Sequence, residues 1–159
     1  MTSDIQLGIE VNPLVDHVGP LANWRVLQET EERPAFIIGT SSDRIGTETG
    51  QAYYGTLSKS LEPLLDLPVS PYAGLSFSDH EDDWNFVAGV NYWLFDQKVS
   101  VTHLWDGENL HTTVDVPWKQ HVFGIIIAQQ EDPDPGQGKD YFLGVTYGLQ
   151  LPSPRFLRD

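Results

Sequence analysis

The chain has 159 residues, 40% of them hydrophobic and 20% charged, so it is long and apolar enough to enclose one core. Nine lysines and arginines against 23 aspartates and glutamates give a net charge of −14, which repels nucleic-acid phosphates and anionic headgroups. The absence of cysteine excludes disulfides, thiolate metal ligands and a cysteine nucleophile. Apolar runs such as 125–128 are far shorter than the roughly 20 residues of a spanning helix. We expect one domain over residues 1–159 and no nucleic-acid partner.

Alternation of apolar with polar or small residues predicts strands along most of the chain. In segment 5–11, four apolar residues alternate with Gln, Gly and Glu, and segment 141–151 repeats the period of two. Ten segments fit the pattern: 5–11, 23–28, 35–40, 51–59, 72–78, 84–95, 98–105, 109–116, 120–128 and 141–151. No segment shows a sustained helical period, although 61–65 has room for one helical turn. The sequence therefore predicts an all-β protein.

The connections between these segments indicate how the strands are joined. Short turns are predicted at Asp96-Gln97, Asp106-Gly107 and Pro117-Trp118, and sequential hairpins make an antiparallel up-and-down meander. Longer connections rich in Pro, Gly, Ser or acidic residues are predicted at 12–23, 41–50, 61–70 and 131–139. Ten strands in an open sheet would leave two exposed edges, which closure removes. We expect a barrel of about ten strands, followed by an irregular tail at 152–159.

The less apolar face of the predicted strands is small and polar. A soluble barrel should carry interspersed charges on its outer face, including lysine, whereas this face has only occasional charges and almost no lysine. It is formed mainly by Gly8, Gly74, Ser76, Ser78, Gly124, Gly144, Thr146, Gly148 and Gln150. We interpret this face as a tightly packed lumen, which places the apolar face outward.

Aromatic residues lie mostly near the predicted strand ends. In transmembrane barrels, aromatic girdles mark the two membrane interfaces. The residues that could form such girdles are Trp24, Trp84, Trp93, Trp105, Trp118, Tyr53, Tyr54, Tyr72, Tyr92 and Tyr141. In a soluble barrel, the same aromatics would fill the core or close its ends.

Segments 34–47, 71–77 and 86–92 resemble the bacterial outer-membrane-type β-barrel family, and the resemblance extends over residues 34–151. It implies a location in the bacterial outer membrane, with membrane lipid or detergent around the barrel, and it implies no activity. The first four residues lack the basic and apolar regions of a secretory signal. This location therefore requires a signal peptide that is not part of the chain as given.

Charged residues on the predicted inner face are the candidate site residues. They are Glu10, Arg25, Glu29, His111 and Asp115. Opposite charges among them would pair and plug a narrow lumen, which gives them a role in stability first. Ten strands enclose little more than their own side chains, so a wide aqueous channel is not expected.

Catalytic and metal clusters are not predicted. His103 and His111 flank the Asp106-Gly107 turn, but alternation places their imidazoles on opposite faces. A membrane-embedded lipid-modifying enzyme would need a nucleophile and a base together near one rim, and Ser100, Thr113, His111 and Asp115 do not combine into such a pair. The acidic segments 79–83 and 131–134 lack EF-hand spacing and are interpreted as solvated loops. We therefore predict no catalytic residue, no metal and no cofactor.

Two hypotheses follow from the same alternation. The leading one is a small, non-catalytic outer-membrane-type barrel with a plugged or narrow polar lumen and acidic loops for surface interactions. The alternative is a soluble, lipocalin-like barrel with an apolar interior that binds a small hydrophobic ligand. They differ in which face of the sheet points inward.

Overall fold

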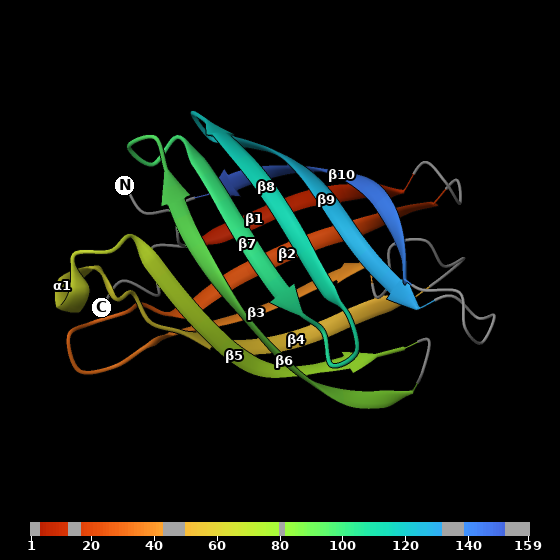
Figure 1. Ribbon diagram of the computed structural model, residues 1–159, viewed down its shortest axis with the longest axis horizontal. Helices are drawn as coiled ribbons and strands as arrows, with labels where there is room; N and C mark the ends of the chain where they lie inside the picture. Colours follow the sequence, from red (N-terminus) through yellow and green to blue (C-terminus); the bar gives the residue numbers. More distant parts are fainter. Residues whose placement is uncertain (1–3, 13–16, 43–49, 80–81, 132–138, 152–159) are drawn as a thin grey trace.

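Ten strands form one closed antiparallel barrel in the computed structural model (Figure 1). The structure describes residues 4–12, 17–42, 50–79, 82–131 and 139–151, and the predicted tail at 152–159 lies outside them. The strands are β1 (Ile5–Asn12), β2 (His17–Leu27), β3 (Ala35–Ser42), β4 (Gln51–Ser58), β5 (Val69–Ser78), β6 (Asp83–Leu94), β7 (Val99–Trp105), β8 (Leu110–Trp118), β9 (His121–Glu131) and β10 (Lys139–Leu151). Each strand pairs with its neighbours in sequence, and β1 pairs with β10. The all-β class, the meander and the closure are thus confirmed.

The start of β2 differs from the prediction. The strand begins at His17, whereas the alternation places its start at residue 23, and the segment before that was predicted to be a long connection. Pro20 weakens the local strand signal because proline has no N–H for the ladder. Pairing with β1 overrides this signal, since Ile9 lies opposite Pro20 and Asn12 opposite His17. β5 likewise starts at Val69 and takes up a proline.

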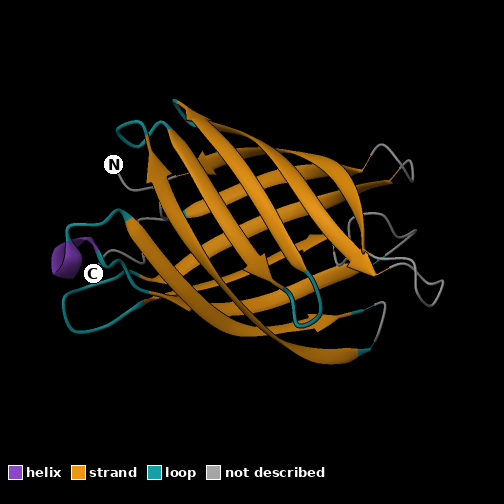
Figure 2. Cartoon of the chain, viewed as in Figure 1, coloured by secondary structure: helices purple, strands orange, loops and turns teal. Residues whose placement is uncertain are grey.

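The two ends of the barrel carry different connections, as Figure 2 shows. At the terminal end, where the first and last described residues lie, the connections are 28–34, 59–68, 95–98 and 119–120. The segment 59–68 contains α1 (Glu62–Leu65), the helical turn predicted at 61–65. The opposite end, called the far end, includes the β7–β8 turn at 106–109. No helix in the described part of the chain is long and apolar enough to cross a membrane.

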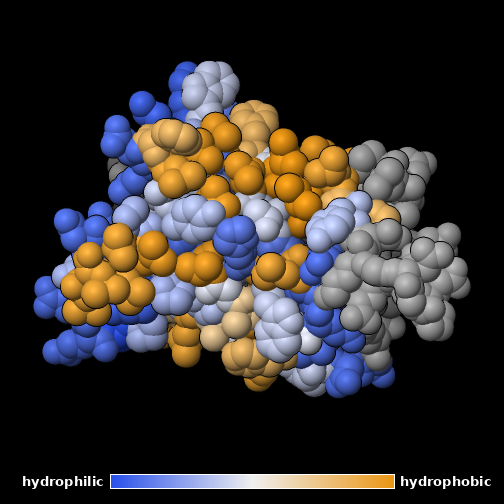
Figure 3. Space-filling view, viewed as in Figure 1, coloured by the Kyte–Doolittle hydropathy of each residue, from blue (hydrophilic) through white to orange (hydrophobic). Residues whose placement is uncertain are grey.

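The pleat of the strands sorts side chains into outward and inward sets. On β1, Leu7 and Ile9 point outward and are 48% and 46% exposed, whereas the next residue, Glu10, points inward and is only 3% exposed. On β9, Ile125 is 53% exposed and its neighbour Ile126 is 8% exposed. Figure 3 shows the resulting apolar side chains in patches over the barrel wall. The apolar face of the sheet is therefore the outer face.

Glycines occupy inward positions where the curved backbone leaves no room for a side chain. A Cβ on Gly8 would lie 2.0 Å from the carbonyl oxygen of Tyr147 and 2.8 Å from the Cα of Gly148, its partner across the β1–β10 seam. A Cβ on Gly74 would lie 2.0 Å from the carbonyl oxygen of Gly55. These close approaches involve backbone atoms, which cannot swing away as a flexible side chain can. The small residues on this face thus permit the curvature that closes the barrel.

Replacing the seam glycine tests this account. We expect Gly8→Ala to lower the unfolding free energy by roughly 1 to 3 kcal/mol, as overpacking does in other cores. Gly55→Ala is the matched control, because a Cβ there would contact only ring atoms of Phe36 at 3.5 Å, an ordinary van der Waals distance. Urea unfolding of the two purified variants, both folded in the same detergent, measures the difference. Equal midpoints for both variants would contradict the close approach at Gly8.

Candidate functional site

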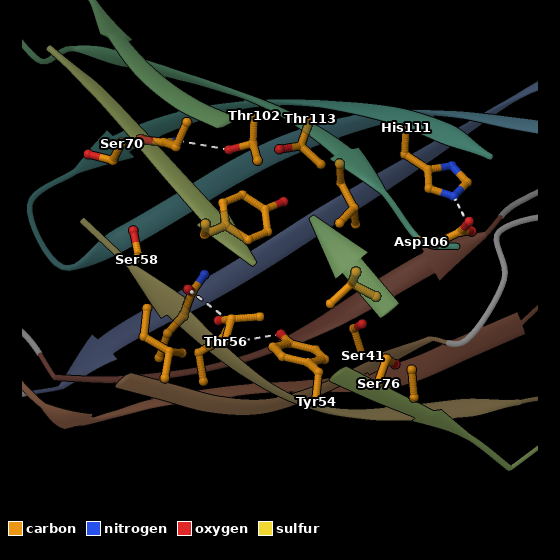
Figure 4. A pocket seen from close by; sticks show the side chains of 18 of the residues that line it. Ser41, Tyr54, Thr56, Ser58, Ser70, Ser76, Thr102, Asp106, His111 and Thr113 are labelled. Atoms are coloured by element: carbon orange, nitrogen blue, oxygen red, sulfur yellow. Dashed lines mark hydrogen bonds and ion pairs between the residues drawn. The ribbon is translucent and has the colours of Figure 1, made fainter. Parts of the chain in front are cut away.

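The interior of the barrel holds an elongated cavity of about 660 Å³ (Figure 4). Most of its lining side chains are polar. The lining comes from β1 to β9, from the β7–β8 turn and from Glu29 just beyond β2. The polar and charged lining residues are Gln6, Glu10, Asn23, Arg25, Glu29, Ser41, Tyr54, Thr56, Ser58, Ser70, Tyr72, Ser76, Asn85, Asn91, Thr102, Asp106, Glu108, His111 and Thr113. Seven apolar side chains share the lining: Ala35, Ile37, Ala52, Val87, Trp93, Leu104 and Ile126. The cavity is the candidate functional site.

The structure places the five residues predicted for the lumen on the inner side of the barrel or at its mouth. Glu10, Arg25 and His111 line the cavity from β1, β2 and β8. Glu29 also lines it, from just beyond the end of β2. Asp115 is on the inner face of β8, where its Oδ1 would lie 2.2 Å from a Cβ on Gly124.

Two of these residues form ion pairs with partners that the sequence analysis did not single out. Arg25 Nε lies 3.1 Å from Oδ1 of Asp4, whose side chain is 3% exposed. Lys59 Nζ lies 3.6 Å from Oε1 of Glu29, which places this second pair at the terminal end. Asp4 could have been found by extending the alternation of β1 backward by two residues from Gln6. Like Gln6 and Glu10 it has an even number, so it falls on the same face of the sheet.

Asp106 organises the β7–β8 turn and binds His111. Its Oδ1 accepts hydrogen bonds from the backbone N–H groups of Glu108 and Asn109, at 2.9 and 2.7 Å. Its Oδ2 lies 2.6 Å from Nε2 of His111. Figure 4 draws this contact as a dashed line. Gly107, between Asp106 and Glu108 in this turn, has φ +113°, a backbone angle that a residue with a side chain rarely adopts. Burial alone would raise the pKa of the Asp106 carboxyl, but the hydrogen bonds from His111, Asn109 and Glu108 hold this pKa below its ordinary value.

The contacts of His111 leave no free ring nitrogen for acid-base chemistry. Its Nδ1 accepts a hydrogen bond from the backbone N–H of Gln129 at 3.3 Å, so the proton of the neutral ring is on Nε2 and points to Asp106. Ser100 Oγ instead accepts from the side-chain amide of Asn91 at 2.5 Å. The described contacts thus do not join His111 to a serine or threonine nucleophile.

Asp115 does not take part in the His111 pair. Its Oδ2 accepts a hydrogen bond from Thr113 Oγ1 at 3.4 Å, on the same inner face of β8. Among the residues that the structure describes, no group of three or more His, Cys, Asp or Glu side chains is arranged to hold a metal ion.

His103 lies on the outer wall, on the opposite face of the sheet from His111. Its Nε2 lies 3.2 Å from the hydroxyl of Tyr92 on β6, and its Nδ1 lies 2.9 Å from Oγ1 of Thr112 on β8. The imidazole therefore has a hydrogen-bond partner on each neighbouring strand. These partners reduce the cost of a polar ring on an otherwise apolar wall.

Aromatic side chains gather on the outer wall near both ends. Near the far end, Phe77 packs on Trp84 with ring centroids 5.4 Å apart, and Phe86 packs on Trp105 at 6.1 Å. Near the terminal end, a cluster joins Trp118, His121, Phe123 and Tyr147 through pairwise ring contacts. The outer wall thus carries aromatic clusters near each end.

Three of the aromatics predicted for girdles point inward instead. Tyr54, Tyr72 and Trp93 line the cavity. Tyr53 and Tyr54 are consecutive, as are Tyr92 and Trp93, and consecutive strand residues face opposite sides. Only one member of each pair can therefore reach the outer wall.

Comparison of this chain with protein-family models, with curated proteins and with solved structures finds no match.

Removing the Asp106 charge tests the turn. We expect Asp106→Asn to lower the unfolding free energy at neutral pH by roughly 1 to 2 kcal/mol, the scale of hydrogen bonds to a charged group. The folded-state pKa is depressed, so this stabilisation is present above the ordinary carboxyl value of about 4 and is lost as pH falls through the lower folded value.

The measurement is urea unfolding of wild type and variant, both folded in the same detergent, between pH 7 and pH 3. The gap between the two proteins should be constant above about pH 5 and narrow below about pH 4. Asp82→Asn, at an exposed position of the β5–β6 connection, should show no comparable gap. A gap that persists unchanged at acid pH would refute a role for the Asp106 charge.

Proposed function

We propose that this protein is an integral membrane barrel of the bacterial outer-membrane type, with a non-catalytic structural or surface-interaction role. The observation that carries the proposal is the polarity of the two faces. Among the described side chains, the outward positions of the ten strands hold no Asp, Glu, Lys or Arg, whereas the cavity lining is mostly polar. A barrel in water requires the opposite arrangement, with charges outside and apolar side chains inside.

The cost of this surface in water supports a lipid environment. Ile125, Leu143 and Phe86 are each more than half exposed on the outer wall. Each Å² of apolar surface left in water forgoes about 25 cal/mol of stabilisation, and soluble monomers rarely expose apolar patches beyond a few hundred Å². Contact with acyl chains removes this cost, because lipid tails are as apolar as the side chains themselves.

The geometry of the sheet supports the same environment. A closed barrel has no free edge, which a sheet in hydrocarbon requires because no water is present to bind unpaired N–H and C=O groups. β6, β9 and β10 have 12, 11 and 13 residues, against roughly 9 to 11 for a strand that crosses a bilayer. The outer aromatic clusters near the two ends are where interfacial aromatics belong in such a barrel.

The soluble alternative gains no support from the interior. A lipocalin-like site for a hydrophobic ligand needs an apolar cavity with few polar groups. The cavity here contains Glu10, Arg25 and Glu29 among many hydroxyl and amide side chains. The apolar residues that would have to line such a site are on the outer wall.

The surface available for interactions is acidic. At the terminal end, Glu31, Glu32 and Asp66 are exposed, and at the far end Asp82 and Glu108 are exposed. A surface partner at either end would therefore offer basic groups. The acidic segments 79–83 and 131–134 lie partly outside the described residues.

A membrane-association assay tests the proposal. The purified chain, folded in detergent and mixed with phospholipid vesicles, should float with the vesicles in a density gradient and resist extraction by alkaline carbonate. Without detergent or lipid it should aggregate, because its outer wall is apolar. A protein that stays folded and monodisperse in plain buffer would overturn the proposal.

A matched pair of substitutions tests which face meets lipid. Ile125 points outward and pairs with Val114 and Val145, whereas Ile126 lines the cavity. In vesicles, Ile125→Arg should lower the unfolding free energy by roughly 2 to 4 kcal/mol, the cost of arginine near a bilayer midplane. Ile126→Arg should cost less, because the guanidinium enters a polar, acidic cavity. If Ile126→Arg were the more damaging change, the outer wall would not be the lipid-facing surface.

A further inference from the structure

The terminal end of the barrel has two sides of opposite charge. One side, which we call the acidic arc, consists of the connections 28–34 and 59–68 between β2 and β5, with five carboxylates against one arginine and one lysine. The other side, which we call the basic arc, consists of the short turns 95–98 and 119–120 between β6 and β9, with two lysines against one carboxylate. Because β7 and β8 are neighbours, the two turns of the basic arc are adjacent on the rim, as Figure 2 shows.

The lysines of the basic arc are available to an external anion. Lys98 and Lys119 are both exposed. Among the residues that the structure describes, neither of them forms an ion pair, whereas Lys59 in the acidic arc is paired with Glu29. Two ammonium groups without a carboxylate partner therefore lie on adjacent turns.

Large aromatic side chains flank these lysines. Phe95 is 72% exposed and Trp118 is 60% exposed. Nζ of Lys119 lies 5.1 Å from the centre of the Trp118 ring, and this ring also contacts His121 on the outer wall. The ammonium of Lys119 is thus held on the outer side of the rim. Tryptophan is enriched at the level of lipid headgroups because its ring is apolar and its N–H is polar.

The backbone of both turns suits glycine, although neither turn contains one. The φ angle is +53° at Phe95 and +59° at Lys119, in the left-handed region that residues with bulky side chains rarely adopt. Residues held in such conformations gather at functional sites. Because both side chains are exposed, they add little to the packing of the barrel, which indicates a contact outside the chain.

We propose that the basic arc binds the phosphate groups of anionic phospholipids at the membrane surface. This inference rests on the proposed membrane location and names the lipid class that this side of the terminal end prefers. The ammonium groups of Lys98 and Lys119 pair with the phosphates, while Phe95 and Trp118 enter the layer between headgroups and acyl chains. A lipid is favoured over free phosphate because the lysines lie beside exposed aromatic side chains at the edge of an apolar wall.

The net charge of −14 does not prevent this contact. Salt at physiological strength screens exposed charges beyond roughly 8 Å, so the groups nearest a headgroup determine the local attraction. Within the basic arc, Asp96 offsets one of the two lysines. One net cation near a membrane surface corresponds to roughly a fivefold preference for an anionic lipid.

The test is the local lipid composition at the basic arc of the full chain in phosphatidylcholine vesicles. The chain has no cysteine, so Gln120→Cys in the 119–120 turn provides a unique site for a fluorophore. Quenching is compared between phosphatidylglycerol and phosphatidylcholine that carry the same nitroxide on an acyl chain. We expect phosphatidylglycerol to be enriched about fivefold in 0.1 M NaCl and hardly at all in 1 M NaCl, where the Debye length is about 3 Å. Equal quenching by both lipids at low salt would overturn the inference.

A second label position provides the spatial control. Leu64 is 73% exposed on α1, in the acidic arc, and Leu64→Cys leaves every charge in place. A fluorophore there should show no enrichment of phosphatidylglycerol. Equal enrichment at positions 64 and 120 would contradict a site at the basic arc.

Substitutions identify the groups responsible. Lys98→Gln combined with Lys119→Gln should abolish the enrichment at position 120, whereas Lys98→Arg combined with Lys119→Arg should keep it, because the charge is retained. Lys59→Gln is the matched control, since it removes a lysine at the same end that is already paired with Glu29. Enrichment that survives the loss of both lysines, or that Lys59→Gln reduces equally, would refute the assignment.

Flotation of the same preparations separates the two proposals. Flotation with phosphatidylcholine vesicles, together with enrichment of phosphatidylglycerol at the basic arc, supports both. Flotation without enrichment overturns the phospholipid site and leaves the membrane location standing. Failure to float with vesicles of either lipid overturns the membrane location, and the inference about the phospholipid site falls with it.

Discussion

The backbone ladder between β1 and β10 is the contact on which the rest of the structure depends. It pairs residues 5–11 with residues 145–151 and removes the last free edge of the sheet. The curvature that it requires brings Gly8 against Gly148, so the inner face must be built from small residues where strands approach most closely. Once the sheet is closed, every second side chain is enclosed and every other one is turned to the surroundings. The polarity of each face then determines which surroundings the protein can tolerate.

The enclosed face combines two requirements. Glycine, serine and threonine keep the volume of the inner side chains small, so a cavity remains despite the modest strand number. Charged side chains such as Arg25 are acceptable there because Asp4 supplies a partner within the same interior. Asp106 has a different role, because its hydrogen bonds to the backbone and its contact with His111 stabilise the β7–β8 turn at the far end of the cavity.

Much of the fold could be predicted from the sequence because alternation is a local signal. The period of two in 5–11 and 141–151 identifies the strands that form the seam, and the Asp106-Gly107 pair identifies a tight turn. The start of β2 could not be predicted, because Pro20 hides a strand that only pairing with β1 reveals. Long-range pairing overrides local preference in such segments.

The candidate site could be predicted less completely from the sequence than the fold. Parity alone places Glu10, Arg25, His111 and Asp115 on the less apolar face, but it does not name their partners. The pairing of Arg25 with Asp4 spans 21 positions and depends on the register of β1 against β2. The existence of a cavity depends on the summed volumes of side chains from nine strands, which no local pattern contains. The prediction of outer aromatic girdles used only the closeness of a residue to a strand end. It is wrong for Tyr54, because the consecutive residues Tyr53 and Tyr54 face opposite sides of the sheet.

The meander has a consequence for how the chain reaches this state. Nearly every ladder joins strands that are adjacent in sequence, so most of the barrel can form hairpin by hairpin through short-range contacts. The seam alone joins segments that are more than 130 residues apart. The entropy of bringing distant parts of the chain together is therefore concentrated in a single closing step. Until that step, the outermost strands present unpaired backbone to their surroundings, and the time spent in the open sheet is the interval in which chains would pair with one another instead.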